Sequence, residues 1–454
     1  NLLMNLLKKI FSPSILLISF LLLIYTFYKS EIFFGGGNRN YYKSYYFISL
    51  IFIFFSIISF FISSKIKEYL IILGISLVIS LYSFEGYFTF IKPSIKQFSK
   101  ERLYEDQTGK KWDKRSKFEL YKDLKRNNDK INVIYTPEAL IEEKYSTVPL
   151  PLSGLSNTNT INCNENGYYS IYQSDRYGFN NPDYEWSNEE IEYLLVGDSF
   201  THGACVNRGK DISSVLRNLS NKSVLNLGMS GNGPLIQYAT LREYLNTNVR
   251  KVLWIYFEGN DFYNLKKEIN NNILASYLKD INFTQNLKLK QNEIDSLLSN
   301  LIIEKHRKTE INNFVFELIE FIKISNIRHL IFPPPEVPEE KQRAELAARG
   351  TSAPEVEFKK ILKLTKEFAN KNNSKLYFVY LPQYYRYTTD YNNANYNLVK
   401  NIVDELKITF IDIHEKVFEK EQNPLKLFPF EKNGHYNING YKKVAETIFK
   451  FTKD

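Results

Sequence analysis

The stretch YLLVGDSFTHGACV, residues 193–206, decides the fold class of this chain. It begins as an apolar run and changes abruptly to small and polar residues at Gly197-Asp198-Ser199. This pattern is typical of a buried strand that ends in a turn into a helix. Ser199 is then either a helix-capping serine or a nucleophile at the carboxyl edge of a parallel sheet.

Strand and helix patterns alternate from residue 191 onward. Short apolar strands are predicted at 192–197, 223–228, 251–257, 375–381 and 409–413, and the helices between them include 211–219, 234–245 and 355–372. Such alternation favours a parallel sheet that is covered by helices on both faces.

A long insertion, residues 262–354, separates the third and fourth predicted strands. Residues 286–308 and 311–326 within it have helical patterns, whereas the Pro-, Ala- and Glu-rich segment 333–355 predicts an exposed loop followed by a short helix. The insertion is either a lid, a surface for a protein partner or ordinary helical padding.

The amino-terminal part contains three apolar segments, residues 10–28, 45–64 and 69–91. Each is long enough to cross the roughly 30 Å of hydrocarbon in a bilayer. A cleaved signal peptide is the alternative for the first segment, but no small-residue cleavage site follows it. Basic residues before the first helix and between the second and third predict a cytoplasmic amino terminus. The remainder of the chain is then extracytoplasmic, which in a bacterium means periplasmic.

The sequence therefore predicts three domains. Residues 1–92 form a membrane domain, residues 93–190 a connector and irregular lead-in packed on the next domain, and residues 191–454 an α/β domain. The net charge of +9 comes from lysines scattered among acids. Because no dense basic run lies beside aromatic residues, nucleic acid is not an expected partner.

The chain has two cysteines, Cys163 and Cys205. They are either buried thiols or, in an oxidising compartment, a disulfide. A bridge of this loop length would stabilise the fold by about 3–4 kcal/mol in the chain-entropy model. It would also tie the segment upstream of the sheet to the region that follows Ser199.

Chemically useful residues follow several of the predicted strands. They are Ser199, the loop NLGMSGNGP (226–234) with Gly231, the turn EGNDF (258–262) with Asn260, and NGHYNINGY (433–441) with His435. Carboxyl ends of parallel strands share one edge of a sheet. A serine activated by an imidazole, facing the amides of Ser199 and Gly231 and the Asn260 side chain as oxyanion donors, is what acyl transfer requires. Taken singly, each of these residues is more often a helix cap, a turn residue or a surface histidine.

The motifs GDSF, SGNG and GND, followed by a late histidine, resemble those of the SGNH (GDSL-type) hydrolase superfamily over about residues 190–452. The resemblance implies a flavodoxin-like three-layer α/β/α fold. It also implies Ser199 as nucleophile, His435 as general base, and Gly231 and Asn260 in the oxyanion hole. The segment SDRYGFNNPD (174–183) resembles the lead-in of membrane-linked bacterial SGNH proteins, some of which modify envelope polysaccharides.

One position departs from that family pattern. The family carries an Asp three residues before the histidine, and this chain has Lys432 there. Glu431 is a candidate acid partner, and the alternatives are a Ser–His dyad or a backbone carbonyl. Asp198 and His202 are candidates for lining the pocket. No metal-ligand spacing and no phosphate-loop or dinucleotide spacing is present, so no cofactor is expected.

The sequence thus predicts a membrane-anchored, extracytoplasmic serine esterase or O-acyltransferase. Its expected substrates are acyl esters of envelope carbohydrates, and its expected partner is the lipid bilayer. The insertion at residues 262–354 offers one surface for a protein partner. The alternative is a catalytically inactive SGNH-fold protein that binds carbohydrate or assembles the envelope. Lys432 and the aromatic-rich segment LPQYYRYTTDYNNANYN (381–397) favour that alternative.

Overall fold

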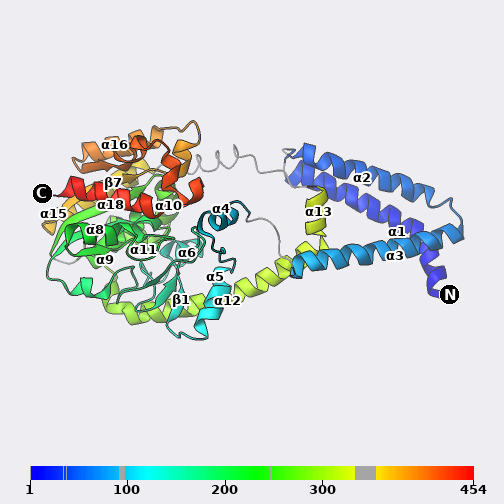
Figure 1. The fold of residues 1–454 in the computed structure, drawn as a ribbon, viewed down its shortest axis with the longest axis horizontal. Helices are drawn as coiled ribbons and strands as arrows, with labels where there is room; N and C mark the ends of the chain where they lie inside the picture. Colours follow the sequence, from blue (N-terminus) through cyan, green and yellow to red (C-terminus); the bar gives the residue numbers. More distant parts are fainter. Residues whose placement is uncertain are drawn as a thin grey trace. The chain divides into compact units, whose positions relative to one another are not determined.

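The computed structural model describes residues 2–33, 35–36, 38–91, 98–245, 248–332 and 354–453. The predicted loop and short helix in segment 333–355 lie, but for its last two residues, outside the described residues. The chain divides into two compact units, which are drawn in Figure 1. One unit comprises residues 1–96 and 308–342, and the other residues 97–307 and 343–454.

The first unit is helical. Its elements are α1 (Leu2–Phe27), η1 (Tyr28–Phe33), α2 (Arg39–Ile58), α3 (Ser64–Gly86) and η2 (Tyr87–Ile91). Within the described residues, three helices are long and apolar enough to cross a membrane: Met4–Phe33, Arg39–Ile58 and Ser64–Phe90. These helices begin before the predicted apolar segments because a helix continues through flanking polar residues. Three helices of this kind at the amino terminus fit membrane anchoring.

Part of the long insertion belongs to this helical unit. The two helical patterns predicted in the insertion merge into one helix, α12 (Gln291–Ile322), which is followed by α13 (Ser325–Ile331). The unit boundary falls within α12, at residue 308. This division differs from the predicted one, which assigned all of 262–354 to the α/β domain.

The second unit begins with the lead-in. Its elements are α4 (Phe98–Thr108), α5 (Lys117–Lys125), β1 (Ile131–Val133), α6 (Pro137–Glu142), β2 (Asn159–Ile161), β3 (Ile171–Gln173) and η3 (Asp183–Ser187). A reciprocal capping box of Ser116 and Glu119 starts α5. β2 pairs in parallel with β1 and antiparallel with β3, which gives a small sheet.

The main sheet is parallel and has the order β5-β4-β6-β7-β8 among the described residues. The strands are β4 (Ile191–Gly197), β5 (Val224–Asn226), β6 (Val249–Phe257), β7 (Lys375–Leu381) and β8 (Thr409–Asp412). Numbered along this domain, the order is 2-1-3-4-5, which is the flavodoxin-like order. The predicted α/β class and flavodoxin-like sheet are therefore confirmed.

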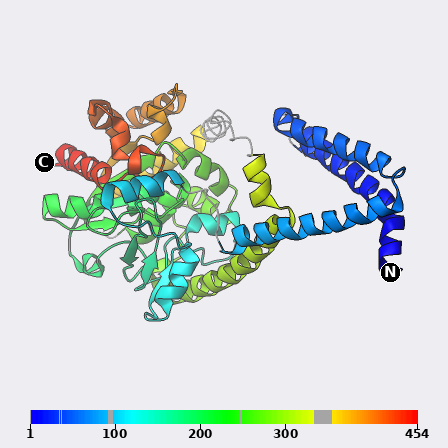
Figure 2. The same ribbon diagram turned by 45° about the vertical axis from the view of Figure 1, so that its right-hand side comes forward.

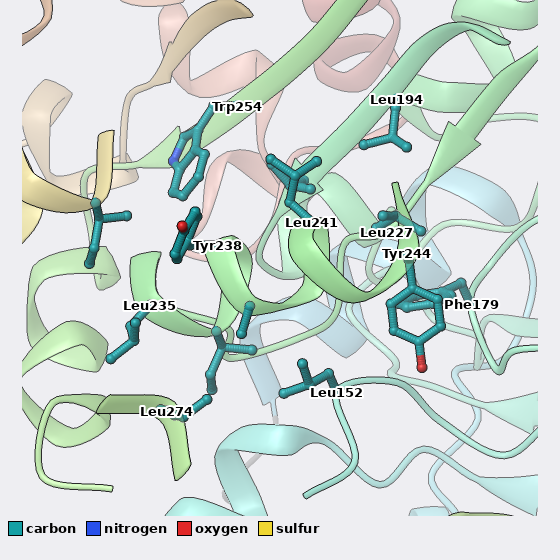
Figure 3. Packing of buried hydrophobic residues seen from close by; sticks show 14 of the residues in the cluster. Leu152, Phe179, Leu194, Leu227, Leu235, Tyr238, Leu241, Tyr244, Trp254 and Leu274 are labelled. Atoms are coloured by element: carbon teal, nitrogen blue, oxygen red, sulfur yellow. The ribbon is translucent and has the colours of Figure 1, made fainter. Parts of the chain in front are cut away.

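Helices cover both faces of this sheet. On one face α9 (Pro234–Tyr244), α10 (Asp261–Glu268), α11 (Asn272–Lys279), α15 (Glu355–Lys371) and α16 (Ala394–Glu405) enclose the larger core. On the other face lie α8 (Ile212–Ser220) and α18 (Ile438–Thr452). Figure 3 shows α9 directing Leu235, Tyr238 and Leu241 into the larger core, near Trp254 of β6.

The remaining elements of this unit are short. They are α7 (Ser199–His202), η4 (Leu287–Lys290), η5 (Tyr384–Tyr387), α17 (Ile413–Lys416), η6 (Phe418–Lys420), η7 (Pro424–Leu427) and η8 (Pro429–Glu431). The strand order reverses at β4, because β5 lies on one side of it and β6 on the other. In open α/β sheets the carboxyl edge at such a reversal is where ligands bind.

Candidate active site

Ser199 lies directly after β4, at the start of the short helix α7. The Asp198 side chain caps this helix by accepting a hydrogen bond from the Phe200 amide at 2.9 Å. Gly197 makes the tight turn possible, because a Cβ atom there would lie 2.6 Å from the Ile255 carbonyl oxygen. The turn therefore presents the Ser199 hydroxyl at the carboxyl edge of the sheet, and capping is done by Asp198 instead of Ser199.

His435 reaches Ser199 from the loop before α18. Its Nε2 atom lies 2.8 Å from Ser199 Oγ. The other ring nitrogen, Nδ1, lies 3.0 Å from Glu165 Oε1. Because a carboxylate only accepts hydrogen bonds, Nδ1 carries the proton and Nε2 is free to accept the hydroxyl proton of Ser199. The side chain of His435 is 24 % exposed, so the pair is open to solvent on one side.

Glu165 is held against the histidine by a second hydrogen bond. Its Oε2 atom accepts a hydrogen bond of 2.7 Å from the backbone amide of His435. Gly434 permits this approach, because a Cβ atom at that position would lie 2.6 Å from Oε2. Ser199, His435 and Glu165 thus form a continuous hydrogen-bonded series of hydroxyl, imidazole and carboxylate.

The loop that carries Glu165 joins β2 to β3 in the lead-in. A disulfide links Cys163 in this loop to Cys205, which lies just after α7. The Asn166 side chain adds a hydrogen bond of 2.9 Å to the Cys205 carbonyl. A covalent bond therefore holds the acid and the nucleophile, which belong to different parts of the chain, at one end of the sheet.

Three groups remain the predicted oxyanion donors: the amides of Ser199 and Gly231 and the side chain of Asn260. The Ser199 amide is in the first turn of a helix, where amides have no acceptor within the helix. Gly231 adopts the left-handed conformation, with φ +79°, in the loop after β5. Asn260 precedes α10 but its side chain does not cap that helix. A capping asparagine uses its side-chain oxygen as the acceptor. The Oδ1 atom of Asn260 is buried and has no hydrogen-bond partner among the described residues, so this side chain is not committed to the helix.

Buried polar side chains fix the loop that contains Gly231. Glu268 accepts hydrogen bonds from the amides of Gly233, Leu235 and Ile236 at 2.5, 2.9 and 3.3 Å. Asn264 donates to the Gly231 carbonyl at 2.8 Å. These contacts hold the loop in place before a substrate binds, which is what an oxyanion site requires.

The charges of the acid and the base stabilise one another. Burial of Glu165 opposes its ionisation, but the charge of His435 and the hydrogen bonds from its ring and amide hold the pKa of Glu165 below its ordinary value. Burial of His435 likewise opposes protonation, but Glu165 outweighs this and raises the pKa of His435. The imidazolium that forms when His435 accepts a proton is therefore stabilised.

Three of the sequence candidates have other roles. Glu431 was a candidate acid partner, but its carboxylate accepts a hydrogen bond of 3.0 Å from Asn423, and Glu165 occupies Nδ1 of His435 instead. Asp198 and His202 do not line an open pocket, because both are completely buried. Burial raises the pKa of Asp198 to about 6 and lowers that of His202 to about 4.

One group of metal-binding residue types occurs within the described part of the chain: Glu165, Cys205 and His435. Cys205 is in a disulfide and so has no thiolate to offer. Of the remaining two side chains, Glu165 is hydrogen-bonded to His435, and His435 is hydrogen-bonded to Ser199 as well. The donor set therefore fits acid–base chemistry and does not fit a metal ion.

Sequence reasoning missed Glu165, Asn264 and Glu268. A signal for Glu165 was present, because it lies two residues after Cys163, and the expected disulfide would bring that segment next to Ser199. Together with Lys432 in the usual place of the acid, this proximity favoured an upstream carboxylate. Asn264 and Glu268 had no comparable signal, since both lie in an ordinary amphipathic helix pattern.

Comparison with known proteins identifies the family. The model of the family described as GDSL-like Lipase/Acylhydrolase matches residues 193–448. A solved structure of a G-D-S-L family protein from Desulfitobacterium hafniense DCB-2 is similar at 13 % identity and a TM-score of 0.31, and covers 57 % of this chain and 99 % of that chain. Among curated proteins, none matches. Because the family model covers more than half of the sequence, the chain belongs to the GDSL-like lipase/acylhydrolase family and is an SGNH-type hydrolase.

Proposed function

We propose that this protein is a membrane-anchored, extracytoplasmic serine esterase or O-acyltransferase that acts on acyl esters of envelope carbohydrates. The observation that carries the proposal is the series Ser199–His435–Glu165, with distances of 2.8 and 3.0 Å. A hydroxyl, an imidazole and a carboxylate in this order are the arrangement that activates a serine nucleophile.

The reaction follows from that geometry. Ser199 Oγ attacks the ester carbonyl carbon, and its proton moves to His435 Nε2. The tetrahedral oxyanion is bound by the amides of Ser199 and Gly231 and by Asn260. The C–O bond to the leaving alcohol then breaks, and His435 gives the proton to that alcohol. Water or a sugar hydroxyl next attacks the carbonyl carbon of the acyl-enzyme, and His435 takes its proton. The bond between that carbon and Ser199 Oγ then breaks, which releases the acid or the new ester, and the proton returns from His435 to Oγ.

An open cleft of about 580 Å³ in the α/β unit supports a carbohydrate substrate. It is lined by Arg386, Tyr387, Tyr391, Asn393, His414 and Phe418, among others. Arg386 is paired with Glu258 at 2.5 Å, so its charge does not by itself require an anionic ligand. Phe418 lies 5.2 Å, ring to ring, from Tyr436, which follows His435.

Two features support an extracytoplasmic location. A disulfide persists in oxidising compartments and is rare in the cytosol, and this domain carries the Cys163–Cys205 bridge. Three candidate spans with a cytoplasmic amino terminus would also place the following residues on the opposite side of the membrane.

A fluorophosphonate probe, which reacts with activated serines, tests the enzymatic activity. We expect labelling of the full chain in detergent and none of Ser199→Ala, together with hydrolysis of a short-chain nitrophenyl ester. Folded wild-type protein that neither labels nor hydrolyses the ester would refute the enzyme and favour a binding protein.

The carbohydrate part of the proposal has a separate test. Tyr391→Ala should raise KM for an O-acetylated oligosaccharide by about tenfold, which corresponds to about 1.4 kcal/mol of lost binding. Hydrolysis of the nitrophenyl ester should be unchanged. An equal effect on both esters, or no effect on either, would show that the cleft does not hold the sugar.

A further inference from the structure

The insertion carries a set of exposed apolar side chains in its second half. On the end of α12 and on α13 these are Phe314, Val315, Phe316, Leu318, Ile319, Ile322, Leu330 and Ile331. Phe316 is 64 % exposed and Leu330 is 77 % exposed. Soluble proteins rarely expose contiguous apolar surface of this kind unless it contacts a partner or a membrane.

This segment packs against the third candidate span. The Phe321 ring lies 5.3 Å from the Tyr82 ring and 5.6 Å from the Phe90 ring. The Tyr82 hydroxyl donates a hydrogen bond of 2.9 Å to the Ile322 carbonyl. The exposed apolar side chains are therefore continuous with the surface of a helix that is itself apolar enough to cross a membrane.

A buried carboxylate in the same span holds the start of α13. Glu85 is completely buried and accepts hydrogen bonds from the amides of Asn326 and Ile327 at 2.9 and 3.0 Å. An acid at a helix amino terminus satisfies amides that have no acceptor within the helix. The buried Glu85 of the third candidate span is thus paired with the first turn of α13, which belongs to the insertion.

The other end of α13 meets the second candidate span. The Phe332 ring lies 5.2 Å from the Tyr45 ring. The helices α2 and α3 follow one another through a short loop, so the start of α2 and the end of α3 lie at the same end of the bundle. Figure 1 and Figure 2 show α13 extending between these two helix ends.

The depth of α13 in the bundle matches that of a helix in the membrane interface. Glu85 precedes the end of its span at Phe90, and Tyr45 follows the start of its span at Arg39. At 1.5 Å per residue these contacts lie roughly 7 to 9 Å inside the span ends. Interfacial helices bury their apolar side about 5–10 Å deep. α13 also mixes Asn326 and Arg328 with its apolar residues, which suits an interface better than the hydrocarbon centre.

We propose that residues 314–332 form a membrane-interface element that contacts lipid acyl chains at the leaflet where α2 begins and α3 ends. The insertion is then a second attachment to the bilayer, in addition to the three candidate spans. This role does not depend on the chemistry of Ser199. A protein partner at the same surface is the competing occupant, and lipid is favoured because the surface is continuous with the spans.

Environment-sensitive fluorescence at single introduced cysteines tests the proposal. Both native cysteines are in the disulfide, so an introduced cysteine is the reactive thiol of the unreduced chain. Phe316→Cys and Leu330→Cys are labelled in detergent with a nitrobenzoxadiazole maleimide, and the full chain is reconstituted into phosphatidylcholine vesicles. Leu73→Cys, exposed on α3, is the span control, and Asn300→Cys, exposed on α12 in the α/β unit, is the aqueous control.

We expect a spin-labelled lipid to quench the fluorescence at positions 316 and 330 at least half as strongly as at position 73. Position 300 should instead be quenched by aqueous iodide. Iodide quenching at 316 and 330, equal to that at 300, would overturn the proposal. Protection of 316 and 330 from both quenchers would overturn it in favour of a covering protein. Absence of lipid quenching at position 73 would remove the membrane assignment itself and the proposal with it.

Discussion

Leu253 and Ile255 of β6 have no exposed surface, whereas Leu73 and Ile79 of α3 expose 66 % and 60 % of theirs. In the helical unit, small polar side chains are instead among those that are buried: Ser49 and Ser56 have no exposed surface. The α/β unit thus buries apolar side chains away from water, as the hydrophobic effect requires. The helical unit directs them outward, which is stable when the surrounding solvent is hydrocarbon.

Buried polar groups also differ between the two units. In the α/β unit several of them are charged and connect distant parts of the chain, as in the ion pair of Glu258 with Arg386. In the spans they are mostly hydroxyls bonded to their own helix, as Ser56 is to the Ile53 carbonyl at 2.7 Å. The first kind positions a site between separate elements, whereas the second kind only satisfies a donor within one element.

The largest effect should follow from replacing the carboxylate of the α/β unit. Glu165→Gln removes the charge that stabilises the imidazolium, and we expect kcat to fall about 10⁴-fold, as in other serine hydrolases that lose this acid. His435 must be neutral to accept a proton, and Glu165 raises its pKa. The acid limb of the kcat/KM profile should therefore move to lower pH in the variant. Nitrophenyl ester hydrolysis, read at the isosbestic wavelength, measures both changes.

Glu431→Gln is the matched control for that variant. Glu431 lies four residues before His435 but pairs with Asn423. Its rate and pH profile should remain those of the wild type. If Glu431→Gln moved the acid limb while Glu165→Gln did not, the assignment of the acid would be wrong.

The disulfide should affect the α/β unit alone, because both cysteines lie in it. Removal of the bridge by Cys163→Ser with Cys205→Ser should lower the free energy of unfolding by about 4 kcal/mol. Urea titration followed by tryptophan fluorescence measures this, since Trp112, Trp186 and Trp254 are all in that unit.

The same double variant should also lose esterase activity, because the loop of Glu165 is no longer tied to Cys205. In the background of Glu165→Gln, removal of the bridge should cost little further activity. Wild-type activity without the disulfide would show that the loop holds its position unaided.

A pair of identical substitutions compares the two units directly. Leu253→Ala leaves a cavity in the core of the α/β unit, and it should cost about 3 kcal/mol of unfolding free energy. Leu73→Ala, on an outward surface of α3, should cost less than about 1 kcal/mol in the same detergent. Equal losses, measured by thermal denaturation of the two variants, would mean that Leu73 is covered by protein.

The smallest effect is expected from Ser56→Ala. Its hydroxyl donates within its own helix, and hydrogen bonds in membrane helices contribute about 0.6 kcal/mol on average. We therefore expect a change of that size or less in SDS titration of the chain in mixed micelles, followed by circular dichroism. A loss above about 2 kcal/mol would mean that Ser56 links separate helices, as the polar groups of the α/β unit do.

Most of the fold could be predicted from local pattern. All five main strands were expected at nearly their observed positions, although β5 is shorter than the predicted 223–228, because its last residues enter the loop with Gly231. Ser199, Gly231, Asn260 and His435 were predicted from motifs at strand ends, and the structure brings Ser199 and His435 within hydrogen-bond distance. Glu165 was not predicted, since the search for an acid stayed beside the histidine in sequence.

By itself, the sequence determined the alternation of strands and helices, the three apolar helices and the chemistry available at the strand ends. These features depend on residue periodicity and on turn residues, which act over a few positions. Only the tertiary structure decided which acid meets His435, because that contact joins residues 270 positions apart. It also decided that α13 lies against Glu85, for the same reason: long-range pairings depend on the path of the whole chain, and local residue patterns do not encode that path.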